Sequence, residues 1–225
     1  MRFNIFNQIH KALRALLYDT ALLLQQTNFS HGEEVEASLS RVRHVLDVFD
    51  KHAAHEDNSI LPAIAEYEPA LVDTFEREHE EDHEMAETLR ALVASFENEF
   101  SVEGKMKAGQ EILHAFIAFM TFNLEHMAKE ETVLNERLWR YYTDAEIAEI
   151  NHRIVTSIPH EEMAFTSAWM MKGLSNSEIS RWMKEVQRNA PEFVFSALFS
   201  IAERELSHDR FRKILEDLTE GAMVA

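Results

Sequence analysis

The chain has 225 residues, in which 40 Asp and Glu outnumber 22 Lys and Arg, so its formal net charge is −18. This acidic excess argues against a nucleic-acid-binding protein, because phosphate contacts need clustered Lys and Arg. It also argues against attachment to an anionic membrane surface. Hydrophobic residues make up 46% of the chain, which indicates a folded protein rather than a disordered acidic one.

Cysteine is absent, which excludes disulfides, thiolate metal sites, iron–sulfur clusters and cysteine nucleophiles. The richest apolar stretch, Ile112 to Leu124, is short and contains His114 and Asn123, so we expect no membrane span. The N-terminal stretch is interrupted by charged residues such as Lys11 and Arg14, and it lacks the apolar core of a signal peptide. We therefore expect a cytoplasmic protein.

Glycine and proline are scarce, with five and four residues, which leaves little room for strands joined by turns. Apolar residues follow helical spacing instead, as at Leu13, Leu17 and Leu24. We expect four long helices, at residues 3–27, 34–66, 69–99 and 104–141. Long helices with short connections are typical of an up-down-up-down four-helix bundle. The sequence thus predicts an all-α fold.

The rest of the chain predicts shorter helices. Two helix starts carry capping boxes, Thr143 with Glu146 and Ser175 with Glu178. Pro159 is expected to start a helix that Gly173 ends, and Pro191 a last helix that runs to about residue 220. We predict a bundle at 1–142 and an all-helical extension at 143–225, packed on the bundle or on a partner subunit. Residues expected to serve docking or a homodimer contact are Trp169, Trp182, Phe193, Phe195 and Phe199.

The chain has 12 histidines. A histidine that is followed four residues later by a Glu or a second His is the strongest indication of a metal site, because the two side chains share a helix face. Such pairs fall on the second, third and fourth predicted helices. They are His52 with Glu56, His79 with His83, and His126 with Glu130, and His83 also has this spacing to Glu87. The first predicted helix offers His10.

Depth in the bundle connects these four sets. Two residues on antiparallel helices lie level when they are equally far from the connecting turn, since both helices rise about 1.5 Å per residue. The midpoints between successive sets fall on Gly32, on the break at Tyr67 to Pro69, and on Gly104. We therefore expect five imidazoles and two carboxylates in one layer.

So many titratable groups in a bundle core are costly unless they are paired or bind a metal. Two divalent cations would offset this cost, with carboxylates bridging both ions and imidazoles in terminal positions. Imidazole and carboxylate suit iron, and also manganese or zinc.

Two other interpretations stay open. The histidines could be ordinary residues of an acidic bundle, although this leaves their shared depth unexplained. A ferritin-like iron-handling protein uses Glu-x-x-His pairs; here Glu76 with His79 and Glu80 with His83 crowd onto one helix.

The four sets resemble the hemerythrin-like, or HHE cation-binding, family over about residues 3–142. The matching segments are IHKALRAL, HAAHEDNSILP, EHEEDHEMA and EHMAKEE. The resemblance implies a non-haem centre of two iron ions, joined by an oxo or hydroxo bridge. By this analogy His79, His83 and His126 hold one iron, and His10 and His52 hold the other, on which a position stays open. Glu56 and Glu130 would bridge the two ions.

The implied function is binding or sensing of dioxygen, or of another small diatomic or peroxide ligand. Glu130 follows His126 by four residues, whereas oxygen-carrying hemerythrins usually place an Asp five residues after this His. This departure fits the broader bacterial family better than a dedicated carrier. The alternative is a di-iron redox enzyme acting on peroxide or nitric oxide, but we favour binding over turnover and assign no catalytic residue.

Overall fold

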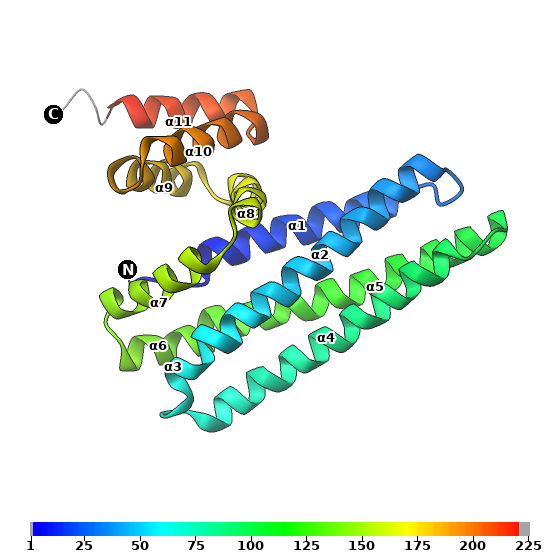
Figure 1. Ribbon diagram of the computed structural model, residues 1–225, viewed down its shortest axis with the longest axis horizontal. Coiled ribbons are helices and arrows are strands. Elements are labelled where there is room, and N and C mark those ends of the chain that lie inside the picture. Colours follow the sequence, from blue (N-terminus) through cyan, green and yellow to red (C-terminus); the bar gives the residue numbers. More distant parts are fainter. Residues whose placement is uncertain (1, 221–225) are drawn as a thin grey trace. The chain divides into compact units, whose positions relative to one another are not determined.

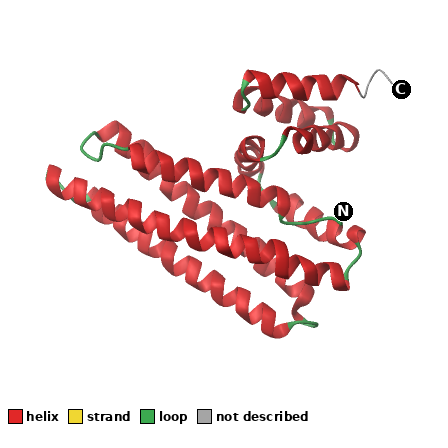
Figure 2. Ribbon diagram, turned by 180° about the vertical axis from the view of Figure 1, so that it is seen from behind, coloured by secondary structure: helices red, strands yellow, loops and turns green. Residues whose placement is uncertain are grey.

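The computed structural model describes residues 2–220, in which every regular element is a helix (Figure 1; Figure 2). The four long helices are α1 (Asn7–Gln26), α2 (Gly32–Ser59), α4 (Pro69–Glu97) and α5 (Val102–Lys129). They form a four-helix bundle that is followed by additional C-terminal helices. The predicted all-α fold is therefore confirmed.

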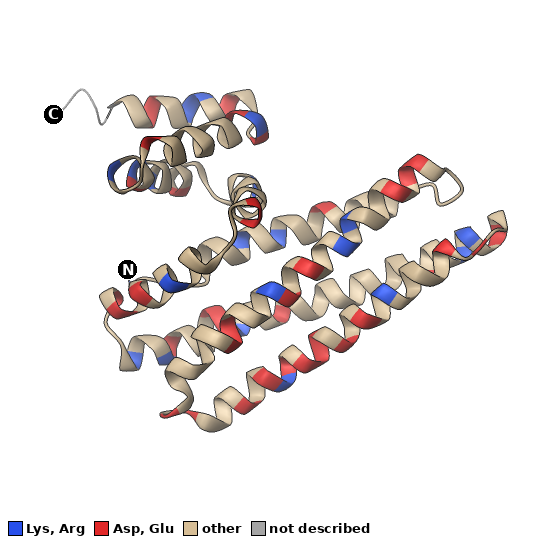
Figure 3. Cartoon of the chain, viewed as in Figure 1, with Lys and Arg blue, Asp and Glu red and all other residues tan. Residues whose placement is uncertain are grey.

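Each long helix presents a seam of buried positions with alternating steps of three and four residues. Along α4 the buried residues are Val72, Phe75, His79, Asp82, Ala86, Leu89, Val93 and Phe96. This spacing keeps one stripe of a helix turned toward its neighbours, as packing in a bundle requires. The remaining positions of α4 are rich in acidic residues, which follow most of the helix length (Figure 3).

The second long helix ends earlier than predicted. Helix α2 stops at Ser59, and a short helix α3 (Leu61–Ala65) follows in place of the expected continuous helix to residue 66. Pro62 explains the break, because its ring would clash with the carbonyl four residues earlier and it disfavours helical geometry at Leu61. The prediction of a continuous helix to residue 66 was therefore wrong.

The fourth long helix is continuous with a π-helical turn, η1 (Glu130–Leu134), and then with α6 (Asn135–Tyr141). The buried seam reaches Glu130 in regular steps and resumes at Leu134 and Leu138. A regular helix would have buried Val133, which is 37% exposed. The extra residue of the π-turn thus shifts the seam by one position, a feature often found at functional sites.

Both predicted capping boxes are confirmed. Helix α7 (Asp144–Ser157) follows Thr143, whose side chain accepts from the Glu146 N–H while the Glu146 carboxylate accepts from the Thr143 N–H. Helix α9 (Asn176–Asn189) starts with the same arrangement at Ser175 and Glu178.

The predicted last helix is two helices, α10 (Glu192–Glu205) and α11 (His208–Glu220), separated by an extended and buried Leu206. The same kind of turn separates α8 (His160–Gly173) from α9, where Leu174 is extended and buried. Leu174 and Leu206 belong to one apolar cluster. Two helix pairs with equivalent turns therefore share this core.

The chain divides into two compact units. One comprises the residues up to Phe6 and Leu16–Thr156, and the other comprises Asn7–Ala15 and the residues from Ser157 onward. Within the first unit, Ile147 and Ile150 of α7 join an apolar cluster that also contains Ile64 and Leu138. No helix within residues 2–220 combines the length and apolar character needed to cross a bilayer.

Candidate metal centre

The predicted donors occupy seam positions on different helices. His10 lies on α1, His52 and Glu56 on α2, and His79 on α4. His126 lies in the last turn of α5, and Glu130 is the first residue of the π-turn. These side chains are held inward because they replace apolar residues in stripes that are otherwise buried.

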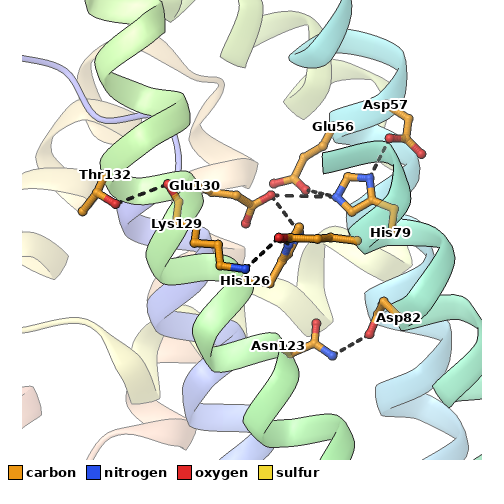
Figure 4. A network of polar contacts seen from close by, with 10 residues as sticks. Glu56, Asp57, His79, Asp82, Asn123, His126, Lys129, Glu130 and Thr132 are labelled. Atoms are coloured by element: carbon orange, nitrogen blue, oxygen red, sulfur yellow. Dashed lines mark hydrogen bonds and ion pairs between the residues drawn. The ribbon is translucent and has the colours of Figure 1, made fainter. Parts of the chain in front are cut away.

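Four of these residues form one close group, Glu56, His79, His126 and Glu130 (Figure 4). Each offers a ligand atom, and these atoms all lie within 4.8 Å of one another. His79 Nε2 is 3.3 Å from Glu56 Oε2 and 3.9 Å from Glu130 Oε1. His126 Nε2 is 3.1 Å from Glu130 Oε1. Both imidazoles therefore present Nε2 to the two carboxylates.

A second group of the same size consists of His10, His52, Glu56 and Glu130. In it, His52 Nε2 lies 3.2 Å from Glu56 Oε1. Glu56 therefore turns one oxygen toward His52 and the other toward His79. Glu56 and Glu130 belong to both groups, and their side chains are only 2% and 0% exposed.

His83 does not join either group. Its side chain is 63% exposed, and Nδ1 lies 3.5 Å from Asp50 Oδ1. The seam of α4 passes from His79 to Asp82 by a step of three, so His83 falls beside the seam. Among the described residues, Glu76 and Glu80 of the ferritin-like alternative also lie outside both groups.

A second layer of carboxylates orients the two imidazoles of the first group. His79 Nδ1 lies 2.6 Å from Asp57 Oδ1, and His126 Nδ1 lies 2.7 Å from Glu78 Oε2. Lys129 Nζ donates to the other Glu78 oxygen at 2.7 Å. Burial would raise the pKa of Glu78, but Lys129 and His126 outweigh it and lower that pKa. These contacts favour a hydrogen on each Nδ1 and leave Nε2 as the inward donor.

The carboxylates give the group a strong preference for positive charge. Burial opposes a proton on His79, but Asp57, Glu130 and Glu56 outweigh burial and raise the pKa of His79 to about 12. Burial likewise opposes a proton on His126, whose pKa is nevertheless raised by Glu130. A cation that binds here would replace these protons, because imidazole ligands must be neutral.

A buried polar pair lies one seam step from the imidazoles. Asn123 Nδ2 donates to Asp82 Oδ1 at 2.6 Å (Figure 4). It also donates to the carbonyl of Phe119 at 3.1 Å. Burial raises the pKa of Asp82, and the hydrogen bond from Asn123 partly offsets this effect. The pair links α4 to α5 next to the centre.

Aromatic rings border the donors. Phe122 stacks on His126 with ring centroids 6.1 Å apart, and Phe75 meets the same imidazole edge-on at 5.7 Å. Phe49 and Phe119 pack against each other at 5.4 Å. These rings limit the access of water to the imidazoles of the centre.

Asp57, Glu78 and the Asp82–Asn123 pair were not identified from the sequence. Asp57 follows Glu56 directly, and Glu78 precedes His79 directly, so adjacency to a predicted donor was the signal that could have found them. Adjacency alone does not decide which carboxylate approaches an imidazole, because α4 carries acidic residues on several sides.

The residues present fit a cation. Within residues 2–220, Nε2 of His79 and Nε2 of His126 make no hydrogen bond of regular geometry, although both are buried. Each points toward buried carboxylate oxygens while its Nδ1 is engaged. Converging imidazole and carboxylate donors with engaged outer nitrogens are the arrangement of a protein metal site.

Comparison with known proteins agrees with this geometry. F-box/LRR-repeat protein 5 from Salmo salar is 22% identical over 172 residues, and that from Mus musculus is 20% identical over the same length. The alignments cover 76% of this chain and 24% of each relative, so the chain spans about a quarter of their length. No solved structure matches. The Hemerythrin HHE cation binding domain matches residues 2–138, and the chain therefore belongs to this cation-binding family.

Proposed function

We propose that this protein is a non-haem di-iron protein that binds or senses dioxygen or a related small molecule. The observation that carries the proposal is the membership of Glu56 and Glu130 in both donor groups. A buried carboxylate between two sets of imidazoles can bridge two cations. Two uncompensated buried carboxylates would instead be costly.

The two groups support a role for each side chain. His79 and His126 would hold one ion, and His10 and His52 the other, with Glu56 and Glu130 shared. Because His83 is exposed, each ion receives two imidazoles rather than the three and two expected from the family analogy. Protein donors would then leave room for a small ligand at either ion.

Bound ferrous iron would supply electrons reversibly to a small oxidant. The chain's own residues prepare this chemistry in two ways. Asp57 and Glu78 fix the imidazoles through Nδ1, and Phe75 and Phe122 shield His126 from water. A shielded centre favours reversible binding over loss of a reactive ligand to solvent.

Metal analysis of the purified protein tests the centre. Protein produced with iron is expected to contain two irons per chain, measured by mass spectrometry, with manganese and zinc measured in the same sample because they accept the same donors. Glu56→Ala should lower the metal content, since it removes a shared ligand, whereas His83→Ala serves as the matched control. Unchanged two-metal content in Glu56→Ala would contradict the bridging role.

Anaerobic absorption spectroscopy separates binding from turnover. For a binding or sensing protein, a new band should appear when the ferrous protein meets dioxygen, and removal of the gas should restore the ferrous spectrum. Rapid consumption of peroxide or nitric oxide that His10→Ala abolishes would identify the redox enzyme instead. A ferrous spectrum that neither dioxygen nor nitric oxide changes would overturn small-ligand binding.

A further inference from the structure

The first turns of α1 pack against helices from the far end of the chain. Residues Asn7–Ala15 form one compact unit with the residues from Ser157 onward. This packing includes a contact at Gly173, the last residue of α8, and one at Glu178 in the first turn of α9. His10 lies within this segment.

At Gly173 the backbones approach too closely for a side chain. A Cβ added at Gly173 would collide with the carbonyl of Lys11 and crowd the amide nitrogen of Ala12. Ala12 is buried, although it lies about 200° around the helix from His10. Its side of α1 is therefore opposite the side that carries His10.

At Glu178 a single carboxylate holds two residues of α1. Glu178 Oε1 accepts from Lys11 Nζ at 2.5 Å and from Asn7 Nδ2 at 3.2 Å. Asn7 and Lys11 are four residues apart on one face and flank His10 in sequence. Glu178 is itself fixed, because its other oxygen completes the capping box with Ser175 and its side chain is only 17% exposed.

We propose that Gly173 and Glu178 are positioning residues for His10, and that they set the affinity for the ion that His10 holds. They do so by fixing the rotation and the depth of the first turns of α1. This inference rests on the proposed di-metal centre. Because coupling between two sites is reciprocal, occupancy by the metal also stabilises the packing of α8 and α9 on α1.

Release of iron from the di-ferrous chain of 225 residues tests the proposal. Anaerobic protein is mixed with a chelator, and the two release phases are followed by absorption. Glu178→Gln keeps the capping box, which accepts Gln, but removes the charge that binds Lys11. Gly173→Ala adds a Cβ that collides with the backbone of α1 at Lys11. In both variants one release phase should accelerate about 10- to 100-fold, as for other residues that orient metal ligands, while the other phase keeps its rate.

Matched controls use the same substitutions elsewhere. Glu205 pairs with Lys172 at 3.1 Å within the C-terminal helices, so Glu205→Gln removes a similar ion pair without touching α1. Gly32→Ala adds a Cβ where no atom lies within 4 Å. Both controls should release iron as the wild type does. Equal release from wild type, Glu178→Gln and Gly173→Ala would overturn the inference and leave the di-metal centre intact.

A wild type that binds no metal would instead contradict the proposed function itself. If Gly173→Ala fails to fold, Glu178→Gln and Lys11→Gln carry the test alone. Hydrogen exchange supplies the reciprocal measurement: amides of residues 160–189 should exchange more slowly in the iron-loaded wild type than in the iron-free protein. This protection should be smaller in Glu178→Gln. Equal exchange rates in the iron-loaded and the iron-free wild type would refute the coupling.

Discussion

Asp57 Oδ1 lies 2.6 Å from Nδ1 of His79, and the imidazole thereby turns Nε2 toward Glu56. This contact fixes the ring orientation and increases the basicity of Nε2. Asp57→Ala should therefore lower the affinity for metal by about 10- to 100-fold. Competition with a chelator measures this change.

Asp73→Ala is the control for Asp57→Ala, because Asp73 is exposed on α4. Its metal affinity should equal that of the wild type. If Asp57→Ala also keeps the wild-type affinity, then Asp57 does not orient a ligand.

Substitutions of His79 and His83 test whether only the histidine in the buried seam of α4 binds metal. His79→Ala should remove a donor that faces two buried carboxylates, and metal content should fall. His83→Ala changes an exposed side chain, so metal content should not change and stability should stay within about 0.5 kcal/mol. Loss of metal in His83→Ala would favour the family analogy over the structure.

The sequence was sufficient to predict the layer of donors but not every member of it. Turn positions and the rise of a helix are local properties, and they place His10, His52, His79 and His126 at one depth. Positions three and four residues after His79 lie on nearly the same side of a helix. Only packing decides that Asp82 enters the seam while His83 stays outside.

The π-turn at Glu130–Leu134 illustrates a second limit. Its register shift depends on how the residues beyond Glu130 pack, as the burial of Leu134 and the exposure of Val133 show. Helical periodicity from the sequence assumes one pitch throughout and cannot locate an extra residue. The breaks at Pro62 and Leu206 had local signals, a proline and a Leu-Ser step like that at Leu174, which the prediction did not use.

Gly109 makes a prediction about the bundle core. A Cβ at Gly109 would collide with the ring of Phe29, which is buried and lies 5.8 Å from the ring of Phe96. Gly109→Ala should lower the free energy of unfolding by about 1–3 kcal/mol. This loss should appear although Ala favours a helix over Gly by about 1 kcal/mol. Urea unfolding followed by circular dichroism measures the change.

Gly32→Ala is the control for Gly109→Ala, because a Cβ at Gly32 meets no atom within 4 Å. Its free energy of unfolding should stay within about 0.5 kcal/mol of the wild type. If Gly109→Ala is as stable as Gly32→Ala, the ring of Phe29 moves aside for the added methyl group without a cost in stability.

Glu178 predicts how acid affects the C-terminal helices. Burial would raise the pKa of Glu178, but Lys11, Ser175 and Asn7 outweigh it and lower this pKa from 4.5 to about 2. The carboxylate is thus more acidic in the folded protein, and its stabilising effect is complete above pH 4.5. This effect should decline as the pH falls from 4.5 toward 2.

Glu178→Gln removes this titration. Near pH 7 the variant should be less stable than the wild type by about 1.5–3 kcal/mol, the usual contribution of hydrogen bonds to a charged group. The difference should shrink as the pH falls below 4.5, because the carboxyl group of the unfolded wild type then takes up a proton that the folded protein binds only near pH 2. Urea unfolding of the iron-free protein at pH 7, 5, 4 and 3.5 measures it. Lys11→Gln should follow the same trend, since it removes the main partner of the carboxylate. If the difference in the free energy of unfolding between wild type and variant stays constant with pH, this ion pair does not stabilise the fold.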